Sequence, residues 1–268
     1  MSTLLSKASA PNALGRIQHI TPASAQWHYV GFEVYELKAG ESLEGLTENT
    51  EVCLVLLRGR ADVYSDEQQW NDIGERDSLF DQQPPYAVYL PPGRGYQVRA
   101  QTDLELALCR APAEGKYPAR LIRPDELHYI TRGSGTNERR VCNILFDDIP
   151  AERLLVVEVI TPNGHWSSYP PHKHDTDAKP RETQLEETYY HRLNPDQGFA
   201  FQRVYTDDRS LDETLTVENK DVVMVPRGYH PVGAPHGYDL YYLNTMAGPE
   251  RTWIFNNDPA HEWMLQRG

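Results

Sequence analysis

The sequence lacks clusters of basic residues, and its overall charge is strongly negative. Only 26 of its 268 residues are Lys or Arg, against 39 Asp and Glu, which gives a net charge of −13. Proteins that bind a nucleic-acid backbone usually present a basic patch, because contacts with phosphates need cations. The composition therefore argues against a nucleic-acid partner and favours a small-molecule ligand.

Cysteine is scarce, and long apolar runs are absent. The 3 cysteines, Cys53, Cys109 and Cys142, each lie in an apolar, strand-like stretch, and their odd number without a C-x-x-C spacing predicts neither a disulfide framework nor a zinc ribbon. No segment approaches the roughly 20 apolar residues of a membrane span, and the N-terminus lacks the apolar stretch of a signal sequence. We expect a soluble cytoplasmic protein with no membrane partner.

Helical periodicity is also rare, whereas residues typical of strands and turns are abundant. The chain contains 16 Tyr, 20 Pro and 18 Gly, and short apolar runs such as 51–57 and 87–90 are separated by proline and glycine turns. This pattern predicts an all-β protein built as a sandwich or barrel. Because the stretch 112–137 is loop-like and contains several prolines, we expect an N-terminal domain over 1–125 and a C-terminal domain over 126–268.

The most informative stretch is PPHKHD, which begins at Pro170. Successive side chains of an extended strand alternate faces, so His172 and His174 lie on the same side and direct two imidazoles at one point. A third histidine, His230, follows the sequence VPRGY. For the pair alone, two exposed histidines are the alternative interpretation. Three imidazoles and one carboxylate form a nitrogen and oxygen set that suits one divalent ion of zinc, manganese, iron or nickel.

The two halves of the chain echo each other. In the first half Glu51 precedes VLLRG and a later stretch reads YLPPGRGYQV; in the second half Glu187 precedes TYYHR and a later stretch reads MVPRGYHPV. Aligning the valines of YQV and HPV places Tyr96 where His230 stands. The first half has no H-x-H between Leu37 and Glu51, so we expect the C-terminal half alone to bind a metal.

These motifs resemble those of the cupin superfamily, in which G, H-x-H and E form the first motif and P-x-G and H form the second. The corresponding residues here are Gly164, His172, His174 and a glutamate for the first, and Pro226, Gly228 and His230 for the second. The resemblance implies two jelly-roll (double-stranded β-helix) barrels in one chain, the N-terminal one without metal ligands. Glu187 is the preferred carboxylate ligand, because Glu187 and Tyr189 resemble the Glu-x-Tyr of related uronate isomerases; Glu182 is the alternative.

More narrowly, nearly the whole chain resembles the uronate isomerase family of two-domain cupins. The strings SSYPPHKHD, LEETYYHRLNP, FQRVYTDD, VPRGYHPVGAPHGYDLYYLN and AGPERTW carry the match. The resemblance implies an aldose-ketose isomerase that converts 5-deoxy-D-glucuronate to 5-dehydro-2-deoxy-D-gluconate in myo-inositol catabolism. Neither composition nor spacing alone names that substrate.

Such an isomerisation passes through an ene-diolate, so it needs a base for a weakly acidic C–H proton and a group that stabilises charge on oxygen. A divalent metal with open coordination positions would serve the second need. The candidate bases are Glu182, Glu186 and His191, and the sequence alone does not choose among them.

The substrate is an acid, so a fixed cation near its carboxylate is expected. Arg203 is the first candidate, with Lys173 and Arg227 behind it, although any one of them alone is more often a solvated surface charge. Tyrosine hydroxyls that are candidates for sugar contacts belong to Tyr189, Tyr205, Tyr229, Tyr241 and Tyr242. Tyrosines in barrel strands more often serve packing.

Two other functions share the same motifs. A metal-dependent cupin dioxygenase uses the same ligand set, and oxygen consumption would separate it from an isomerase. A non-catalytic sugar-binding cupin is the other alternative, but such sensors usually accompany a DNA-binding domain, and the sequence offers no helix-turn-helix candidate. Two-barrel proteins of this kind often associate, which is compatible with a homo-oligomer.

Overall fold

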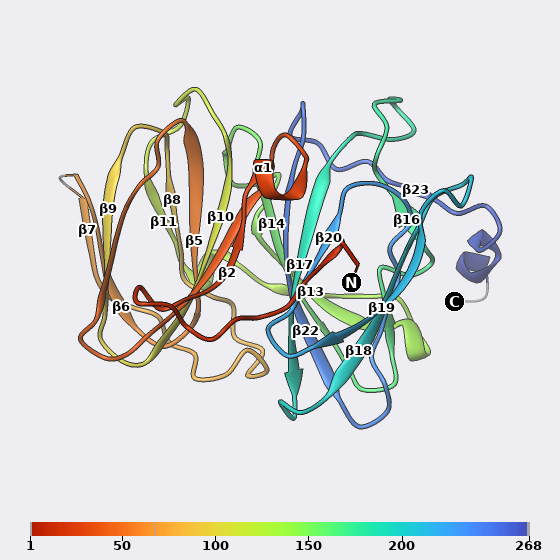
Figure 1. The fold of residues 1–268 in the computed structure, drawn as a ribbon, viewed down its shortest axis with the longest axis horizontal. Helices are drawn as coiled ribbons and strands as arrows, with labels where there is room; N and C mark the ends of the chain where they lie inside the picture. The colour runs from red at the N-terminus through yellow and green to blue at the C-terminus, as the bar shows by residue number, and fades with distance from the viewer. Residues whose placement is uncertain (1, 67, 267–268) are drawn as a thin grey trace. The chain divides into compact units, whose positions relative to one another are not determined.

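The structure, a computed structural model, describes residues 2–66 and 68–266 and consists almost entirely of antiparallel strands (Figure 1). The helical segments are short: α1 (Pro22–Ala25) and the 3-10 turns η1 (Pro124–Glu126), η2 (Gly135–Asn137) and η3 (Glu262–Gln266). The all-β prediction is therefore confirmed. Within the described residues, no helix is both long enough and apolar enough to cross a membrane.

The chain forms two compact units. The N-terminal unit comprises 9–128 and 143–156, and the C-terminal unit comprises Met1–Ala8, Tyr129–Cys142 and Val157–Gly268. Along the chain the unit changes after residues 8, 128, 142 and 156. Strand β1 (Leu5–Ser6) belongs to the C-terminal unit because it pairs with Val222 and Val223, and the segment 143–156 belongs to the N-terminal unit.

The N-terminal unit contains two antiparallel sheets. The six-stranded sheet has the order β11 (Arg120–Ile122), β8 (Ala87–Leu90), β5 (Thr50–Arg58), β10 (Leu104–Pro112), β3 (Gly31–Leu37) and β2 (Arg16–Ile20). The four-stranded sheet has the order β4 (Ser42–Leu46), β9 (Gly95–Ala100), β6 (Ala61–Ser65) and β7 (Gln68–Ile73). Side chains from both sheets, including those of Leu54, Val63 and Leu106, form one apolar core. Burial of each such side chain contributes about 1.5–3 kcal/mol.

The C-terminal unit is built around a larger sheet. Its seven-stranded sheet has the order β1 (Leu5–Ser6), β20 (Val222–Val225), β17 (Glu186–Asn194), β22 (Asp239–Ala247), β14 (Leu155–Thr161), β13 (Arg139–Leu145) and β12 (Tyr129–Arg132). The smaller sheets are β15 (Trp166–Ser167), β21 (Val232–Gly233), β18 (Phe199–Tyr205) and β19 (Asp212–Glu218), and the pair β16 (His172–Lys173) and β23 (Asn256–Asn257). Strand β17 pairs with β20 on one side and β22 on the other, which makes it a central, buried strand.

Strand register corrects one part of the internal repeat. Leu90 and Val225 each end the strand before a proline-glycine turn; Val52 pairs with Leu90, and Glu187 pairs with Val225. The structural counterpart of Glu187 is therefore Val52, and the predicted equivalence with Glu51 is wrong by one residue. Since successive side chains alternate faces, that single step turns Glu51 away from the core in which Val52 lies.

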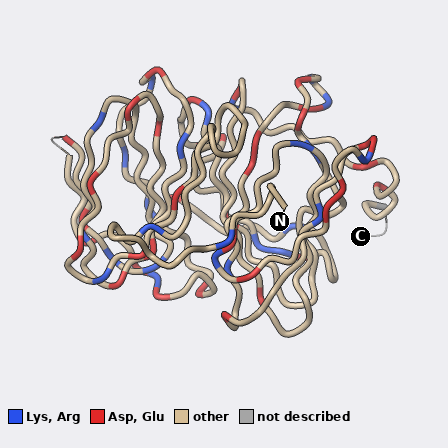
Figure 2. Tube along the Cα trace, in the orientation of Figure 1, with Lys and Arg blue, Asp and Glu red and all other residues tan. Residues whose placement is uncertain are grey.

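Charged residues of both signs are interspersed along the described trace. Figure 2 shows Lys and Arg alternating with Asp and Glu over the strands and loops of each unit. Many of them form exposed ion pairs, such as Lys38 with Asp103 and Arg94 with Asp66. Pairs of this kind contribute about 0–1 kcal/mol each. The surface charge pattern thus gives little indication of a site, and the buried polar side chains are more informative.

Candidate metal centre

The H-x-H pair lies on and just after strand β16. His172 pairs with Asn257 of β23, and the preceding Pro170 and Pro171 cannot donate backbone hydrogen bonds, which disfavours helix. The side chains of His172 and His174 lie on the same side of this extended segment, with ring centroids 6.2 Å apart. Both are largely buried, at 9% and 2% exposure.

The third imidazole reaches the same place from a distant segment. The chain turns at Gly228 with φ +90°, and a side chain there would collide with the backbone carbonyl of Tyr205, so glycine is required. The turn delivers His230, which is fully buried. Its Nδ1 lies 2.8 Å from the carbonyl oxygen of Gly228. Because that oxygen can only accept, Nδ1 carries the proton and Nε2 carries a lone pair.

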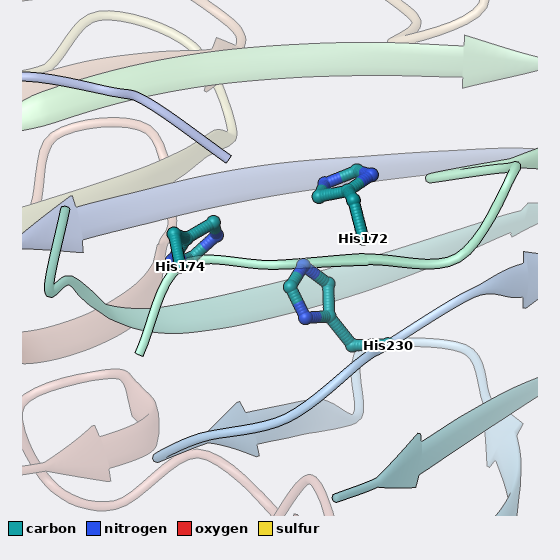
Figure 3. A group of neighbouring side chains, drawn as sticks. All are labelled: His172, His174 and His230. Carbon is teal, nitrogen blue, oxygen red and sulfur yellow. The ribbon is translucent and has the colours of Figure 1, made fainter. Parts of the chain in front are cut away.

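The three imidazoles converge on one point. One ring nitrogen from each of His172, His174 and His230 lies within 4.8 Å of the others, and Figure 3 shows the rings approaching from two chain segments. The His230 centroid is 5.0 Å from that of His172 and 5.1 Å from that of His174. Side chains separated by more than fifty positions in the sequence are thus brought together by strand pairing.

Glu187 completes the set from strand β17. Its Oε2 lies 3.1 Å from Nε2 of His174 and 3.2 Å from Nε2 of His230. The Nδ1 atom of His174 faces the carbonyl oxygen of Leu185 at 3.3 Å, so its Nε2 is also the nitrogen with the lone pair. Nε2 of His230 has no hydrogen-bond partner among the described residues. Two lone pairs and a carboxylate oxygen repel one another at this separation unless a cation lies among them.

A divalent metal ion fits this arrangement. Ligand atoms about 2.0–2.1 Å from a tetrahedral ion lie about 3.3 Å from one another, close to the distances between Glu187 and the two histidines. Burial alone would raise the pKa of Glu187, but the two neighbouring imidazoles, those of His174 and His230, favour the ionised carboxylate and lower this pKa to about 2. Burial, followed by the charges of the other two histidines, lowers the pKa of His172 well below its ordinary value. An ionised carboxylate and a neutral imidazole are the forms that bind metals.

Lys173 and Glu182 lie on the other side of the H-x-H segment. The Lys173 ammonium donates to Asp175 at 2.9 Å and to Glu182 at 3.2 Å. Glu182 also accepts from the backbone N–H of Asp175 at 2.7 Å, and Asp175 accepts from the backbone N–H of Gly228 at 2.7 Å. This cluster joins the two segments that carry the histidines, so it holds the ligand set in position.

His191 lies further along β17, beyond Tyr189. Its Nε2 is 2.9 Å from the amide oxygen of Gln202, and its ring stacks on that of Tyr189 with centroids 6.0 Å apart. Burial lowers the pKa of His191 to about 4. The Tyr189 hydroxyl is 3.0 Å from the hydroxyl of Ser168, and its ring lies 5.7 Å from that of His230. Glu186 is buried, but strand alternation directs it away from the face that carries Glu187.

The other predicted substrate contacts are already engaged. Arg203 makes a two-pronged ion pair with Asp212, with both N–O distances at 2.7 Å. The Tyr205 hydroxyl donates to Asp258 at 2.7 Å, and the Tyr241 hydroxyl donates to Glu158 at 2.9 Å. These carboxylate partners could not be predicted from the sequence, because they lie on neighbouring strands or in distant loops.

Several side chains near the centre escaped prediction. They are Ser168, Arg139, Trp253 and Phe255. The Phe255 ring lies 4.8 Å from that of His172, and the Trp253 ring lies 6.1 Å from it. None of these residues belongs to a motif of fixed spacing. Only the aromatic content of the string AGPERTW hinted at this wall of the site.

Comparison with known proteins identifies the family. The model of the KduI/IolB family matches residues 4–264. The chain belongs to the KduI/IolB family. Among its curated relatives, the 5-deoxy-glucuronate isomerase of Geobacillus thermodenitrificans is 57% identical over 266 residues, which cover 99% of this chain and 97% of that protein. The 5-deoxy-glucuronate isomerase of Bacillus subtilis strain 168 is 49% identical over 271 residues, with 100% of both chains covered.

Solved structures support the fold of this KduI/IolB protein. An IolB-like protein from Salmonella typhimurium LT2 superposes with a TM-score of 0.95 at 54% identity, covering 98% of this chain and 99% of that one. The oxalate decarboxylase of Lactobacillus farciminis superposes with a TM-score of 0.67 over 96% of this chain and 89% of that one. At 14% identity the second likeness concerns the fold alone, and it agrees with the predicted pair of cupin barrels.

Proposed function

We propose that this protein is an aldose-ketose isomerase that converts 5-deoxy-D-glucuronate to 5-dehydro-2-deoxy-D-gluconate in myo-inositol catabolism. Relatives that carry the name 5-deoxy-glucuronate isomerase cover the full chain at 49% and 57% identity. The structural observation that carries the proposal is the convergence of three imidazoles and one carboxylate in the C-terminal unit. The ligand is accordingly a small sugar acid.

His172, His174, His230 and Glu187 are the proposed ligands of one divalent ion of zinc, manganese, iron or nickel. Glu187 is preferred to Glu182, since the Glu182 carboxylate is engaged by Lys173 on the other face of the segment. When bound, such an ion supplies Lewis acidity toward the carbonyl and neighbouring hydroxyl oxygens of the open-chain sugar. The protein positions those oxygens and moves the proton.

His191 is the proposed base. The amide oxygen of Gln202 can only accept, so Nε2 of His191 carries the proton. Its Nδ1 then bears a lone pair, and among the described residues this atom has no hydrogen-bond partner. With its pKa lowered to about 4, His191 is neutral near pH 7. It would take the proton from the carbon next to the aldehyde and return it to the aldehyde carbon, a role commonly worth about 10²- to 10⁴-fold in rate.

The direct test is a proton-exchange assay on 5-deoxy-D-glucuronate in deuterated water, combined with metal analysis of the purified protein. Wild type should form the ketose acid, with deuterium entering at the carbon that receives the proton. His172→Ala should lose both metal and turnover, whereas the matched control His165→Ala should keep both, because His165 contacts a backbone carbonyl outside the ligand set. Oxygen consumption in place of isomerisation, or full metal and turnover in His172→Ala and His230→Ala, would overturn the proposal.

A second pair of variants decides the carboxylate ligand. Glu187→Gln should lower metal affinity, because an amide oxygen is a weaker ligand than a carboxylate for a divalent ion. Glu182→Gln should leave metal affinity nearly unchanged and reduce stability, since it weakens the contact with Lys173. The reverse outcome would assign the ligand to Glu182.

A further inference from the structure

Two arginines face each other beside the metal centre. Arg132 ends β12 and Arg139 begins β13, and they are directly opposite in the antiparallel register. Both are partly buried. Like charges directly opposite in a sheet are destabilising unless an anion lies between them. This pair therefore requires an explanation beyond packing.

The pair lies next to the ligand set. The guanidinium of Arg132 lies over the Trp253 ring, 5.6 Å from its centroid, and that ring packs edge-on against His172 at 6.1 Å. Arg139 is the direct cross-strand partner of this Arg132. Its charge opposes the effect of burial, which raises the pKa of Tyr242. One aromatic ring thus separates the cationic pair from a proposed metal ligand.

The protein offers this pair little compensation. Nη1 of Arg139 donates to the backbone oxygen of Asn137 at 3.0 Å and to its side-chain oxygen at 3.3 Å, both of them neutral acceptors. Within residues 2–66 and 68–266, no carboxylate forms an ion pair with Arg132 or Arg139. Two of the three cations considered from the sequence differ: Arg203 is paired with Asp212, and Lys173 is paired with Asp175, Glu182 and Asp207. The third, Arg227, is exposed.

We propose that Arg139, supported by Arg132, binds the carboxylate of the sugar acid and thereby orients its aldehyde end on the metal centre. The planar fork of a guanidinium matches a carboxylate in two parallel hydrogen bonds. Substrate binding would supply the anion that the pair lacks, so the site would favour acids over neutral sugars of the same shape. This inference rests on the proposed isomerase function and adds the residue that determines its substrate class.

The test compares Arg139→Met with the matched control Arg140→Met. Arg140 is the next residue of β13, and its guanidinium lies over the Tyr129 ring, 5.3 Å from the centroid. Arg140→Met therefore removes the same charge from the other face of the strand. Arg139→Met should raise KM for 5-deoxy-D-glucuronate on the order of 100-fold, as expected for a charge-assisted, two-pronged contact. It should leave the rate with neutral 5-deoxy-D-glucose, which lacks the carboxylate, within a few-fold of wild type. Arg140→Met should change neither value.

A binding measurement separates orientation from folding. Metal-loaded Arg139→Met should keep its metal content and melting temperature, yet lose calorimetric binding of D-gluconate, a sugar acid without an aldehyde. Arg139→Lys, which keeps the charge and loses the fork, should fall between wild type and Arg139→Met.

Each alternative result has a distinct meaning. Unchanged KM and gluconate binding in Arg139→Met overturn the inference while leaving the isomerase proposal intact, and a rise in KM confined to Arg203→Met assigns the carboxylate to Arg203. If wild type fails to isomerise the acid at all, the proposed function fails first.

Discussion

Glu51 of the N-terminal unit is the most exacting test of the strand register. Its carboxylate is fully buried and accepts three backbone N–H groups, from Glu152 at 2.8 Å, Arg153 at 2.6 Å and Leu154 at 2.7 Å. The Tyr89 hydroxyl donates a fourth hydrogen bond at 2.8 Å. The side chain therefore fixes the loop that leads into β14.

Glu51→Gln keeps the shape of the side chain but removes its charge and turns one oxygen into a donor. In the least costly orientation the amide nitrogen faces Tyr89, whose hydroxyl can turn and accept, so the N–H of Glu152 alone loses its partner. Leaving a buried donor unsatisfied costs about 1–3 kcal/mol, and each of the other bonds falls from a charged one to a neutral one, with a loss of about 1 kcal/mol. We expect Glu51→Gln to reduce the free energy of unfolding by about 4–6 kcal/mol.

Urea unfolding measures this change, and Tyr89→Phe is the matched control. Tyr89→Phe removes one donor to the carboxylate and should cost about 1.5–3 kcal/mol, less than Glu51→Gln. Hydrogen exchange at the amides of 152–154 should accelerate in Glu51→Gln. A free energy of unfolding within about 0.5 kcal/mol of wild type, the range of ordinary surface substitutions, would show that Glu51 does not hold this loop.

Three further predictions concern pH, metal and packing. Burial lowers the pKa of His191 from 6.5 to about 4, so the neutral imidazole contributes fully to stability above pH 6.5 and this contribution is lost as the pH falls toward 4. His191→Gln should therefore remove about 3 kcal/mol of the pH dependence of the free energy of unfolding, measured by urea unfolding at several pH values. An unchanged pH dependence in this variant would contradict the prediction. Chelation of divalent metal should lower the melting temperature, because it removes about 2.7 kcal/mol of stability where the metal had stood at 100 times its Kd, and His172→Ala should show no such shift. A Cβ on Gly45 would meet the Tyr96 hydroxyl, so Gly45→Ala should cost about 1–3 kcal/mol in thermal unfolding, while Gly95→Ala, with only ordinary contact to a leucine, should cost less than half as much.

The sequence predicted those parts of the site that depend on local geometry. His172 and His174 share a face because any extended strand alternates, and His230 follows a turn whose glycine has a positive φ. Strands at 51–57 and 87–90 were predictable for the same reason, since short apolar runs between turn residues leave few alternatives. Such features need no knowledge of what lies across the sheet.

Features that depend on pairing between distant strands were not predictable. Whether Arg203 is available to a ligand depends on Asp212, which lies on β19 opposite the same end of β18. The significance of Arg139 depends on its position opposite Arg132 and on the absence of a nearby carboxylate among the described residues. A single sequence lists these charges without showing which of them neutralise one another.

The contrast between the two central strands supports our proposal that the reaction takes place in the C-terminal unit. The inward side chains of β5 are Val52, Leu54 and Leu56, and those at the equivalent positions of β17 are Glu187, Tyr189 and His191. Burying a carboxylate and an imidazole in place of valine and leucine costs several kcal/mol unless they gain partners of equal strength. Stability alone would favour the apolar set, which the N-terminal unit has. The polar set persists in a strand of the same position and burial because the ligands it receives, a metal ion and an acidic sugar in our proposal, offset that cost only in the functioning enzyme.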